Sequence, residues 1–342
     1  MSYRIEQLAM KNYGVIGDLY CDKFSGINLI IGENGTGKTY FLKSLYSAVR
    51  ALEEYKRGDD IRSLNDVLSE KLRWTFQVDK LGDMVTRTAK DELEFGIKIG
   101  ELKTKYQLSA DVSGKVETVT EPAKGKEGNS IFIPAKEVLS LYSIILESRE
   151  VDKVFGFDDT YYDLAKALRI SPSIGEKSAM FAKARKMVGD VIDGKVDYDD
   201  HKGKWYYKNR SNQQFSIGST SEGVKKIAIM DRLLSNRYLD ENSIIFIDEI
   251  EAALHPEAIC QYLDMVDNIA GEMGVQVFIS SHSYFVIKKL LLIAMKRENH
   301  VTCISLGKNR DVQICDLHDG MPDNSIIETS IRLYEQEIEE AL

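Results

Sequence analysis

Short apolar runs alternate with stretches of helical spacing along much of this chain. Residues 27–31 form an apolar run rich in β-branched side chains, which is typical of a buried parallel strand. Apolar residues then recur every three or four positions between residues 41 and 52, which predicts a helix. Further buried strands are predicted at residues 131–133, 243–247, 275–279 and 300–306. Buried strands separated by helices indicate an α/β fold with a mainly parallel central sheet.

Other regions have different patterns. Alternating apolar and polar residues predict antiparallel strands within residues 3–31 and at residues 74–78, 93–99 and 106–108. Helical spacing dominates from about residue 139 to residue 192, in stretches at 139–146, 161–168 and 180–191. A hairpin strand is predicted at residues 204–208, and residues 121–129 are the best linker candidate because they contain Pro122, Gly125 and Gly128. We therefore expect an antiparallel β-subdomain and a helical lobe beside the central sheet.

These boundaries divide the chain into three predicted segments. Residues 1–130 would form a first lobe with the antiparallel sheet, and residues 131–215 a helical lobe with a hairpin insertion. Residues 216–342 would form a second lobe that ends in an acidic helix from residue 325.

Composition narrows the class of protein. The 342 residues are 43% hydrophobic and 29% charged, which describes a soluble globular chain with a sizeable core. The net charge of −9 argues against a surface that binds nucleic acid everywhere, but it leaves room for a local basic groove. The four cysteines form no C-x-x-C pair, so we expect reduced thiols and no metal bound by them. With no apolar run near ~18 residues, we expect no membrane span and a cytoplasmic location.

A complete phosphate-binding motif, G-x-x-x-x-G-K-[ST], lies between the first buried strand and its helix. It comprises Gly32, Glu33, Asn34, Gly35, Thr36, Gly37, Lys38 and Thr39. Its glycines let backbone N–H groups turn around a polyphosphate, and the helix N-terminus and Lys38 add positive charge. Thr39 is placed to hold Mg²⁺ with its hydroxyl, and Tyr40 completes the predicted nucleotide-binding set. Tyr13 and Lys11 are candidates for base or phosphate contact, with a packing tyrosine in a surface turn as the alternative.

Two acids end the apolar strand at residues 243–247. Asp248 and Glu249 are adjacent there, and successive side chains at a strand end diverge, so only one can reach a metal beside the phosphate loop. We expect Asp248 to hold Mg²⁺ and Glu249 to activate water. His282 follows the next strand, at the edge where ligands bind in such sheets, and is predicted to sense the γ-phosphate.

In this order the motifs resemble those of ABC-type ATPase heads of the SMC/RecF/OLD-like group, including stand-alone AAA-type ATP-binding proteins. Residues 32–39 look like the Walker A loop, residues 244–249 like Walker B, and residues 251–256 like the D-loop. Ser221, Glu222 and Gly223 resemble the signature loop, although Glu222 stands where transporters have a glycine. The Q-loop glutamine, a further metal contact in the family, is assigned to Gln77, with Gln107 as the alternative. Long coiled-coil arms and a Toprim nuclease domain are not expected.

The resemblance implies a mechanism and partners. Lys38 would bind the β- and γ-phosphates of ATP, and Ser221 and Gly223 would reach the nucleotide of a second subunit in a head-to-tail dimer or higher oligomer. Hydrolysis would bias that dimer toward opening. The switch would regulate a separately encoded effector, such as a nuclease or toxin in bacterial anti-phage defence. The alternatives are a RecF-like clamp that binds DNA through residues 202–210 or through Lys225 and Lys226, and a scaffold with slow turnover.

Overall fold

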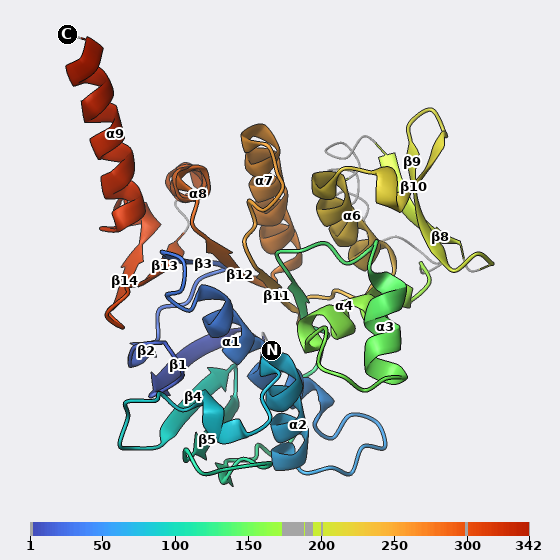
Figure 1. The fold of residues 1–342 in the computed structure, drawn as a ribbon, viewed down its shortest axis with the longest axis vertical. Helices are drawn as coiled ribbons and strands as arrows, with labels where there is room; N and C mark the ends of the chain where they lie inside the picture. The colour runs from blue at the N-terminus through green and yellow to red at the C-terminus, as the bar shows by residue number, and fades with distance from the viewer. Residues whose placement is uncertain (1–2, 173–187, 189–193, 200, 298–299, 342) are drawn as a thin grey trace.

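A six-stranded sheet runs through the middle of the molecule (Figure 1). The computed structural model describes residues 3–172, 188, 194–199, 201–297 and 300–341. The sheet has the strand order β14 (Val312–Asp316), β13 (Val301–Leu306), β3 (Ile27–Gly32), β12 (Gln276–Ser281), β11 (Ile244–Ile247) and β7 (Ile131–Ile133). All neighbouring strands pair in parallel except β14, which is antiparallel to β13. The predicted α/β class and mainly parallel sheet are confirmed.

Alternating side chains on β3 serve two separate cores. Leu29 and Ile31 pack with helices α7 (Pro256–Met273) and α8 (Tyr284–Arg297), whereas Ile30 faces α1 (Lys38–Glu54) on the opposite side. This follows from the period of two along a strand. Because both faces are covered, the strand is apolar except at the buried Asn28, whose side-chain amide donates to the carbonyls of Ser25 and Val277.

The second core lies between α1 and an antiparallel sheet. That sheet has the order β2 (Leu19–Cys21), β1 (Ile5–Lys11), β4 (Leu93–Ile99), β5 (Leu102–Leu108) and β6 (Thr118–Val119). The predicted β-subdomain is therefore present, but the strand predicted at residues 74–78 is wrong. Residues 74–76 belong to α2 (Leu64–Phe76), which Ser63 caps by accepting the N–H of Asp66. The buried stripe of Leu64, Val67, Leu68 and Leu72 explains the helix.

The helical lobe contains α3 (Tyr142–Glu150) and α4 (Asp159–Arg169), as predicted. The helix predicted at residues 180–191 lies outside the described residues, apart from residue 188. A small antiparallel sheet follows, made of β8 (Gly194–Asp199), β9 (Lys204–Asn209) and β10 (Gln214–Ser216), so the predicted hairpin strand is confirmed. Next come α6 (Glu222–Ser235) and, at the end of the chain, α9 (Ser325–Ala341), which projects away from the body (Figure 1).

The three-segment division stays a prediction. The central sheet contains β3 from the first segment, β7 from the second, and β11 and β12 from the third. Backbone hydrogen bonds therefore join the three segments. No helix among the described residues is long and apolar enough to cross a membrane.

A buried ion pair ties the end of α1 to the linker and to β11. Glu53 and Lys126 are both fully buried, and Lys126 Nζ lies 2.7 Å from Glu53 Oε1. Glu53 also accepts hydrogen bonds from the N–H and hydroxyl of Ser130, while Lys126 donates to the carbonyl of Asn242 at 2.7 Å. Burial alone would raise the pKa of Glu53, but Lys126 and Arg50 hold it below its ordinary value. The carboxylate is therefore ionised and satisfied inside the core.

Replacing Lys126 tests this ion pair. Lys126→Met leaves the buried, charged Glu53 with Arg50 as its remaining cationic partner, so we expect it to lower the free energy of unfolding by about 3 kcal/mol at pH 8. The loss should be smaller at pH 5, because removal of Lys126 raises the pKa of this buried carboxyl and favours its protonation. Urea unfolding followed by circular dichroism measures both values. Lys124→Met, at an exposed lysine two residues earlier, should change stability by less than about 0.5 kcal/mol. Equal losses in the two variants would contradict the assignment.

Candidate nucleotide-binding site

The turn between β3 and α1 requires glycine at two positions. Gly32 has φ 151°, and a Cβ there would lie 2.4 Å from the carbonyl oxygen of Leu306. Gly37 has φ 96°, and its Cβ would lie 2.8 Å from Cγ2 of Val15. Both positions combine a backbone conformation that favours glycine with a close neighbour. The glycines of the motif are therefore explained by the shape of the loop.

The start of α1 offers hydrogen-bond donors to an anion. Gly37 is the N-cap and supplies no side-chain acceptor, so the first N–H groups of the helix have no partner within it. Lys38 Nζ lies inside the loop, donating to the carbonyls of Gly32 at 2.8 Å and Glu33 at 3.0 Å. Burial lowers the pKa of Lys38, and the nearby acids partly offset that effect. Free N–H groups, the helix dipole and an ammonium together form a phosphate site.

Asp248 follows β11 and meets hydroxyls from two other elements. Thr39 Oγ1 donates to its carboxylate at 2.9 and 3.0 Å, and Ser280 Oγ at the end of β12 donates to Oδ1 at 2.6 Å. Burial raises the pKa of Asp248, and the bonds from Ser280 and Thr39 oppose that rise. Hydroxyl and carboxylate oxygens are the donors that Mg²⁺ takes in phosphate sites, so Thr39 and Asp248 fit a magnesium ion.

Glu249 has a constrained backbone next to this carboxylate. Its φ is 43°, a conformation rare for residues other than glycine. Two contacts hold it: its N–H donates to Ser280 Oγ at 2.9 Å, and its carbonyl accepts from Lys226 Nζ at 2.6 Å. Burial lowers the pKa of Lys226 to about 8. One serine hydroxyl thus positions both Asp248 and Glu249.

A third acid orients the histidine. Glu251 Oε1 accepts the N–H of His282 at 2.8 Å and lies 3.3 Å from its Nδ1. The histidine side chain is 46% exposed, while that of Glu251 is 9% exposed. His282 therefore stands at the carboxyl edge of the sheet with its ring available to a ligand, as its position after β12 predicted.

The signature segment lies at the start of α6. Ser221 caps that helix by accepting the N–H of Val224, and Ser221 and Glu222 are exposed. A Cβ on Gly223 would lie 2.8 Å from Cδ2 of Leu254, so the glycine lets α6 pack against the predicted D-loop. Across the part of the chain that the structure describes, no hydrogen bond or ion pair joins this segment to the phosphate loop of the same chain.

The remaining predicted site residues have other surroundings. Glu33 forms an ion pair with Lys308, and Asn34 and Gly35 are exposed. The Tyr40 ring packs against Tyr13 and Phe76, and its nucleotide-binding role stays a prediction.

The structure supports one of the two predictions for Tyr13 and does not test the predicted metal role of Gln77. Tyr13 is fully buried and its hydroxyl lies 2.9 Å from that of Tyr106, which supports the packing alternative. Gln77 ends α2 with φ 51°, and its buried Nε2 has no partner among the described residues, so its metal role stays a prediction.

Sequence reasoning missed several residues of this site. Ser280 belongs to no predicted motif, and Glu251 was placed in the predicted D-loop without a role toward His282; their roles depend on contacts with residues about 30 positions away. Lys226 was assigned with Lys225 to a possible DNA surface, and that is wrong, because both are buried. The sequence did indicate this burial, because Lys226 shares a helical face with the apolar residues Met230 and Leu233, which are also buried.

Comparison with known proteins agrees with this geometry. A family model described as "AAA domain, putative AbiEii toxin, Type IV TA system" matches residues 27–288, and the chain belongs to that family. The predicted likeness to ABC-type heads of the SMC group is confirmed as well. The match spans the phosphate loop, the two acids and the histidine together.

Solved structures of SMC heads have a similar fold. An SMC head bound to the C-winged helix domain of ScpA has a TM-score of 0.54 and 13% identity, over 92% of this chain and 97% of that chain. The Pyrococcus furiosus SMC head with an extended coiled coil, bound to the C-terminal domain of ScpA, has a TM-score of 0.51 and 12% identity, over 97% and 99%. A comparison with curated proteins found no match. The fold is thus that of a P-loop ATPase head.

Removing the Ser280 hydroxyl tests the geometry. A hydrogen bond to a charged group contributes about 1.5–3 kcal/mol, so Ser280→Ala should weaken the apparent Mg²⁺ affinity of nucleotide binding roughly tenfold or more. Losing this bond also raises the pKa of Asp248, so Mg²⁺ binding should fail at a higher pH than in the wild type. Titration of Mg²⁺ with a fluorescent ATP analogue at several pH values measures both effects. Ser280→Thr should restore binding. Ser281→Ala is the control, because that hydroxyl contacts Ser283, and an equal effect there would contradict the role.

Proposed function

We propose that this protein is a switch ATPase that binds and hydrolyses ATP with Mg²⁺. The proposal rests on the hydrogen bond from Thr39 to Asp248 and on the position of Glu249 beside them. Ser280 binds both acids and so sets that position. Membership of the AAA family and the SMC-head fold support it. A phosphate loop alone would fit kinases and GTPases equally well, and the adjacent acids favour hydrolysis.

Each residue of the site then has a chemical task. The N–H groups at the start of α1 and the Lys38 ammonium bind the β- and γ-phosphates. When ATP binds, the hydrogen bonds from Lys38 to the carbonyls of Gly32 and Glu33 are replaced by hydrogen bonds to phosphate oxygens. Thr39 and Asp248 hold the metal, which supplies charge neutralisation at the phosphates. Glu249 orients a water molecule and accepts its proton. His282, oriented by Glu251, contacts the γ-phosphate.

We further propose that two copies assemble head to tail around ATP. Ser221 and Glu222 are exposed, although the family resemblance places this segment at a nucleotide. A second copy would bring them to the phosphate loop of the first. Loss of the γ-phosphate would remove contacts between the copies, so hydrolysis would shift the population toward the open state.

The output of the switch is proposed to be control of a separate protein effector in bacterial defence. The family description names a toxin of a type IV toxin–antitoxin system, and both similar SMC heads are bound to parts of ScpA in their crystal structures. The surface also favours a protein partner over DNA. On the hairpin, Lys202 lies 3.6 Å from Asp199 and Lys208 lies 3.5 Å from Asp197, which weakens the field that a DNA clamp would need.

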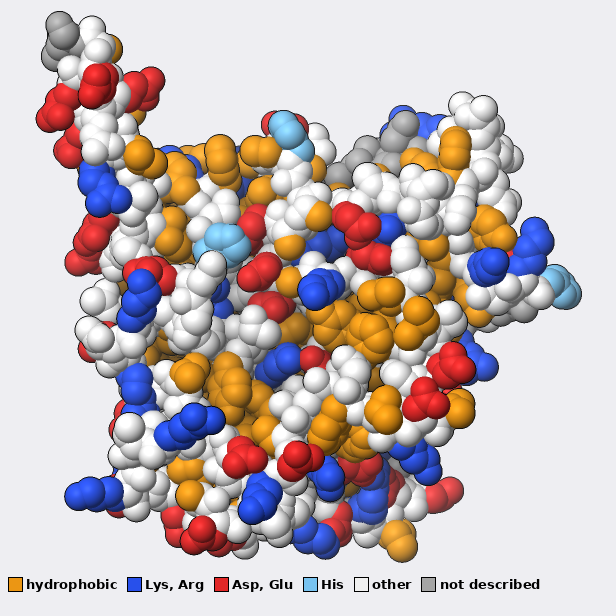
Figure 2. Space-filling view, in the orientation of Figure 1, with side chains coloured by type: hydrophobic (Ala, Val, Ile, Leu, Met, Phe, Trp, Pro, Cys, Tyr) orange, Lys and Arg blue, Asp and Glu red, His pale blue; other side chains and the backbone are white. Residues whose placement is uncertain are grey.

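The projecting helix α9 offers a docking surface for such an effector. Ile331, Tyr334 and Ile338 recur at helical spacing and are exposed by 53%, 65% and 45%. Five glutamates and one arginine lie along the same helix between residues 328 and 340, and acidic side chains follow it in Figure 2. Two copies of this helix would repel each other. We therefore infer that α9 binds a partner protein with an apolar stripe flanked by basic residues.

Substitution of Glu249 tests the ATPase assignment. Glu249→Gln retains the size of the side chain and removes the base, so hydrolysis should fall by about 10²-fold or more while ATP binding persists. ATP should then accumulate a dimer, visible by light scattering after size exclusion. Lys38→Ala should instead lose nucleotide affinity. Wild-type turnover by Glu249→Gln would remove that residue from its role, and unchanged ATP binding by Lys38→Ala would overturn the phosphate-loop assignment.

The effector surface is tested with the product of the adjacent gene. Tyr334→Asp should abolish co-purification with that product, because it places a charge in the apolar stripe. Gln336→Asp adds the same side chain on the opposite face of α9 and should leave binding intact. If neither variant affects the complex, α9 is not its docking surface. ATPase activity that double-stranded DNA stimulates, with steeply salt-dependent binding, would favour the clamp instead.

A further inference from the structure

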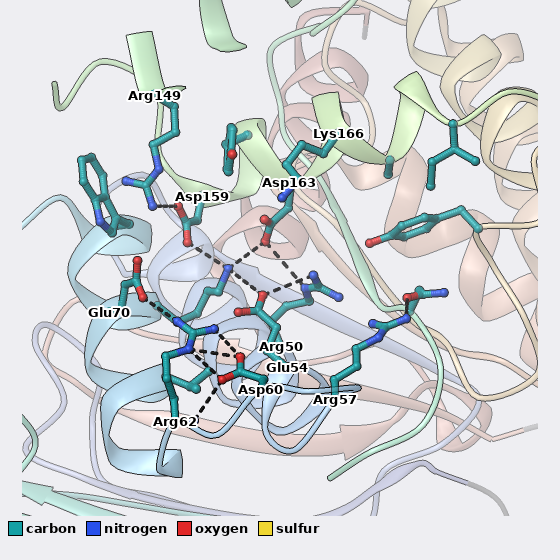
Figure 3. A pocket seen from close by; sticks show the side chains of 18 of the residues that line it. Arg50, Glu54, Arg57, Asp60, Arg62, Glu70, Arg149, Asp159, Asp163 and Lys166 are labelled. Carbon is teal, nitrogen blue, oxygen red and sulfur yellow. Dashed lines mark hydrogen bonds and ion pairs between the residues drawn. The ribbon is translucent and has the colours of Figure 1, made fainter. Parts of the chain in front are cut away.

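A second cavity, of about 830 Å³, lies at the far end of α1 from the phosphate loop (Figure 3). It is enclosed by the last turns of α1, the loop that follows, α2, and the helices α3 and α4. Arg50 lies twelve residues beyond Lys38 on the same helix, a separation of about 18 Å along its axis. The cavity is therefore distinct from the proposed ATP site, and its volume suits a small molecule.

The acids that line this cavity already have cationic partners. Asp163 and Asp159 lie 3.1 and 2.9 Å from Lys71 Nζ, which meets both carboxylates between α2 and α4. Glu54 lies 3.1 Å from the same ammonium and 3.3 Å from Arg50. Asp60 and Glu70 both pair with Arg62 at the mouth. Figure 3 shows these pairs as two groups, one around Asp159, Asp163 and Glu54 and a separate one around Arg62. The negative charge of the lining is thus largely neutralised.

The hydrogen-bonding capacity left over consists mainly of donors. Arg57, Lys153 and Lys166 line the cavity, and within the described residues none has a carboxylate within ion-pair distance, although Nη2 of Arg57 already donates to Asn129 Oδ1 at 2.8 Å. Arg50 is 8% exposed, and its Nε lies 3.6 Å from Asp163 Oδ2, which is too far for a hydrogen bond. The buried Nη1 of Arg149 also lacks one. Buried donors without acceptors are costly, and a ligand rich in acceptors would satisfy them.

Aromatic packing fixes one of these cations in place. The guanidinium of Arg149 lies 3.2 Å from the centroid of the Trp74 ring, and one of its other nitrogens pairs with Asp159 at 3.1 Å. Phe155 packs against the same indole in a T-shaped arrangement, with ring centroids 5.0 Å apart. A guanidinium held on an aromatic face loses little further freedom when it binds an oxyanion. Arg149 is thus preorganised as an anion contact.

We propose that this cavity binds a small polyanion through a pyrophosphate group. Phosphate oxygens are acceptors only, which matches the unused donors, and more than one phosphate is needed to reach the separate cations from α3, α4 and the loop after α1. The seven cations of the lining exceed its five acids, although the whole chain carries a net charge of −9. The attraction of an anion to this cavity therefore comes from the nearby cations, and the affinity should fall as the salt concentration rises.

The experiment separates this cavity from the ATP site. Lys38→Ala is used as the background, so that the phosphate loop is disabled, and inorganic pyrophosphate without Mg²⁺ is titrated by calorimetry at low salt. We expect saturable binding at one site, and at least a tenfold loss of affinity when Lys153→Ala and Lys166→Ala are added. Both lysines are exposed, so the variants should keep the wild-type circular dichroism spectrum.

A charge-matched control completes the test. Lys23→Ala with Lys103→Ala removes the same charge from exposed positions outside the cavity and should leave the affinity unchanged. Binding should also alter the fluorescence of Trp74, and Trp74→Phe should remove that signal. Pyrophosphate that fails to bind the Lys38→Ala background would overturn the proposal, as would equal losses in the two lysine pairs. Either failure leaves the ATPase proposal standing, because its tests concern Lys38 and Glu249.

Discussion

The carboxylate of Asp248 is the point on which the candidate site depends. It sits at the end of a buried strand, where an unpaired charge would be unfavourable, and hydroxyls from α1 and β12 hold it. These bonds join three elements that are far apart in sequence. Because Ser280 also binds the N–H of Glu249, the same contacts set the backbone of the neighbouring acid. The positions of both acids, and the ionisation of Asp248, therefore rely on packing of the parallel sheet.

The helix α1 connects the two sites of the molecule. Its first turn faces the phosphate loop, and its last turns contribute Arg50 and Glu54 to the second cavity and Glu53 to the buried pair with Lys126. The helix is thus anchored at its far end by charges whose loss would be costly. A ligand in the second cavity would contact the same rigid element that presents the phosphate loop. That arrangement gives a physical route by which one site could influence the other.

Cations have two different uses in this chain. Lys71, Lys126 and Lys226 are buried and hold carboxylates or carbonyl oxygens in place, whereas the lysines of the β8–β10 hairpin are exposed beside aspartates. Neither set forms a continuous basic surface. The projecting helix α9 adds acidic and apolar groups instead. The distribution of charge therefore supports the proposed protein partner more than it supports DNA binding.

Much of the fold and of the site followed from local patterns. Gly32 to Thr39, Asp248 with Glu249, and His282 are recognisable because each motif combines a fixed spacing with a strand or helix that periodicity predicts. The helix at residues 74–76 was misassigned because Trp74 and Phe76 alternate, while packing of the longer stripe from Leu64 decides its structure.

Other features depended on the tertiary structure. The contacts of Ser280 and Lys226 and the pairing of Lys71 with Asp163 join residues between 22 and 92 positions apart. The second cavity likewise arises only where several segments meet. The phosphate-binding loop and its acids can be recognised from the chain alone, because backbone geometry and local spacing specify them. Which side chains hold those acids depends on burial and on partners, and these are properties of packing between distant elements.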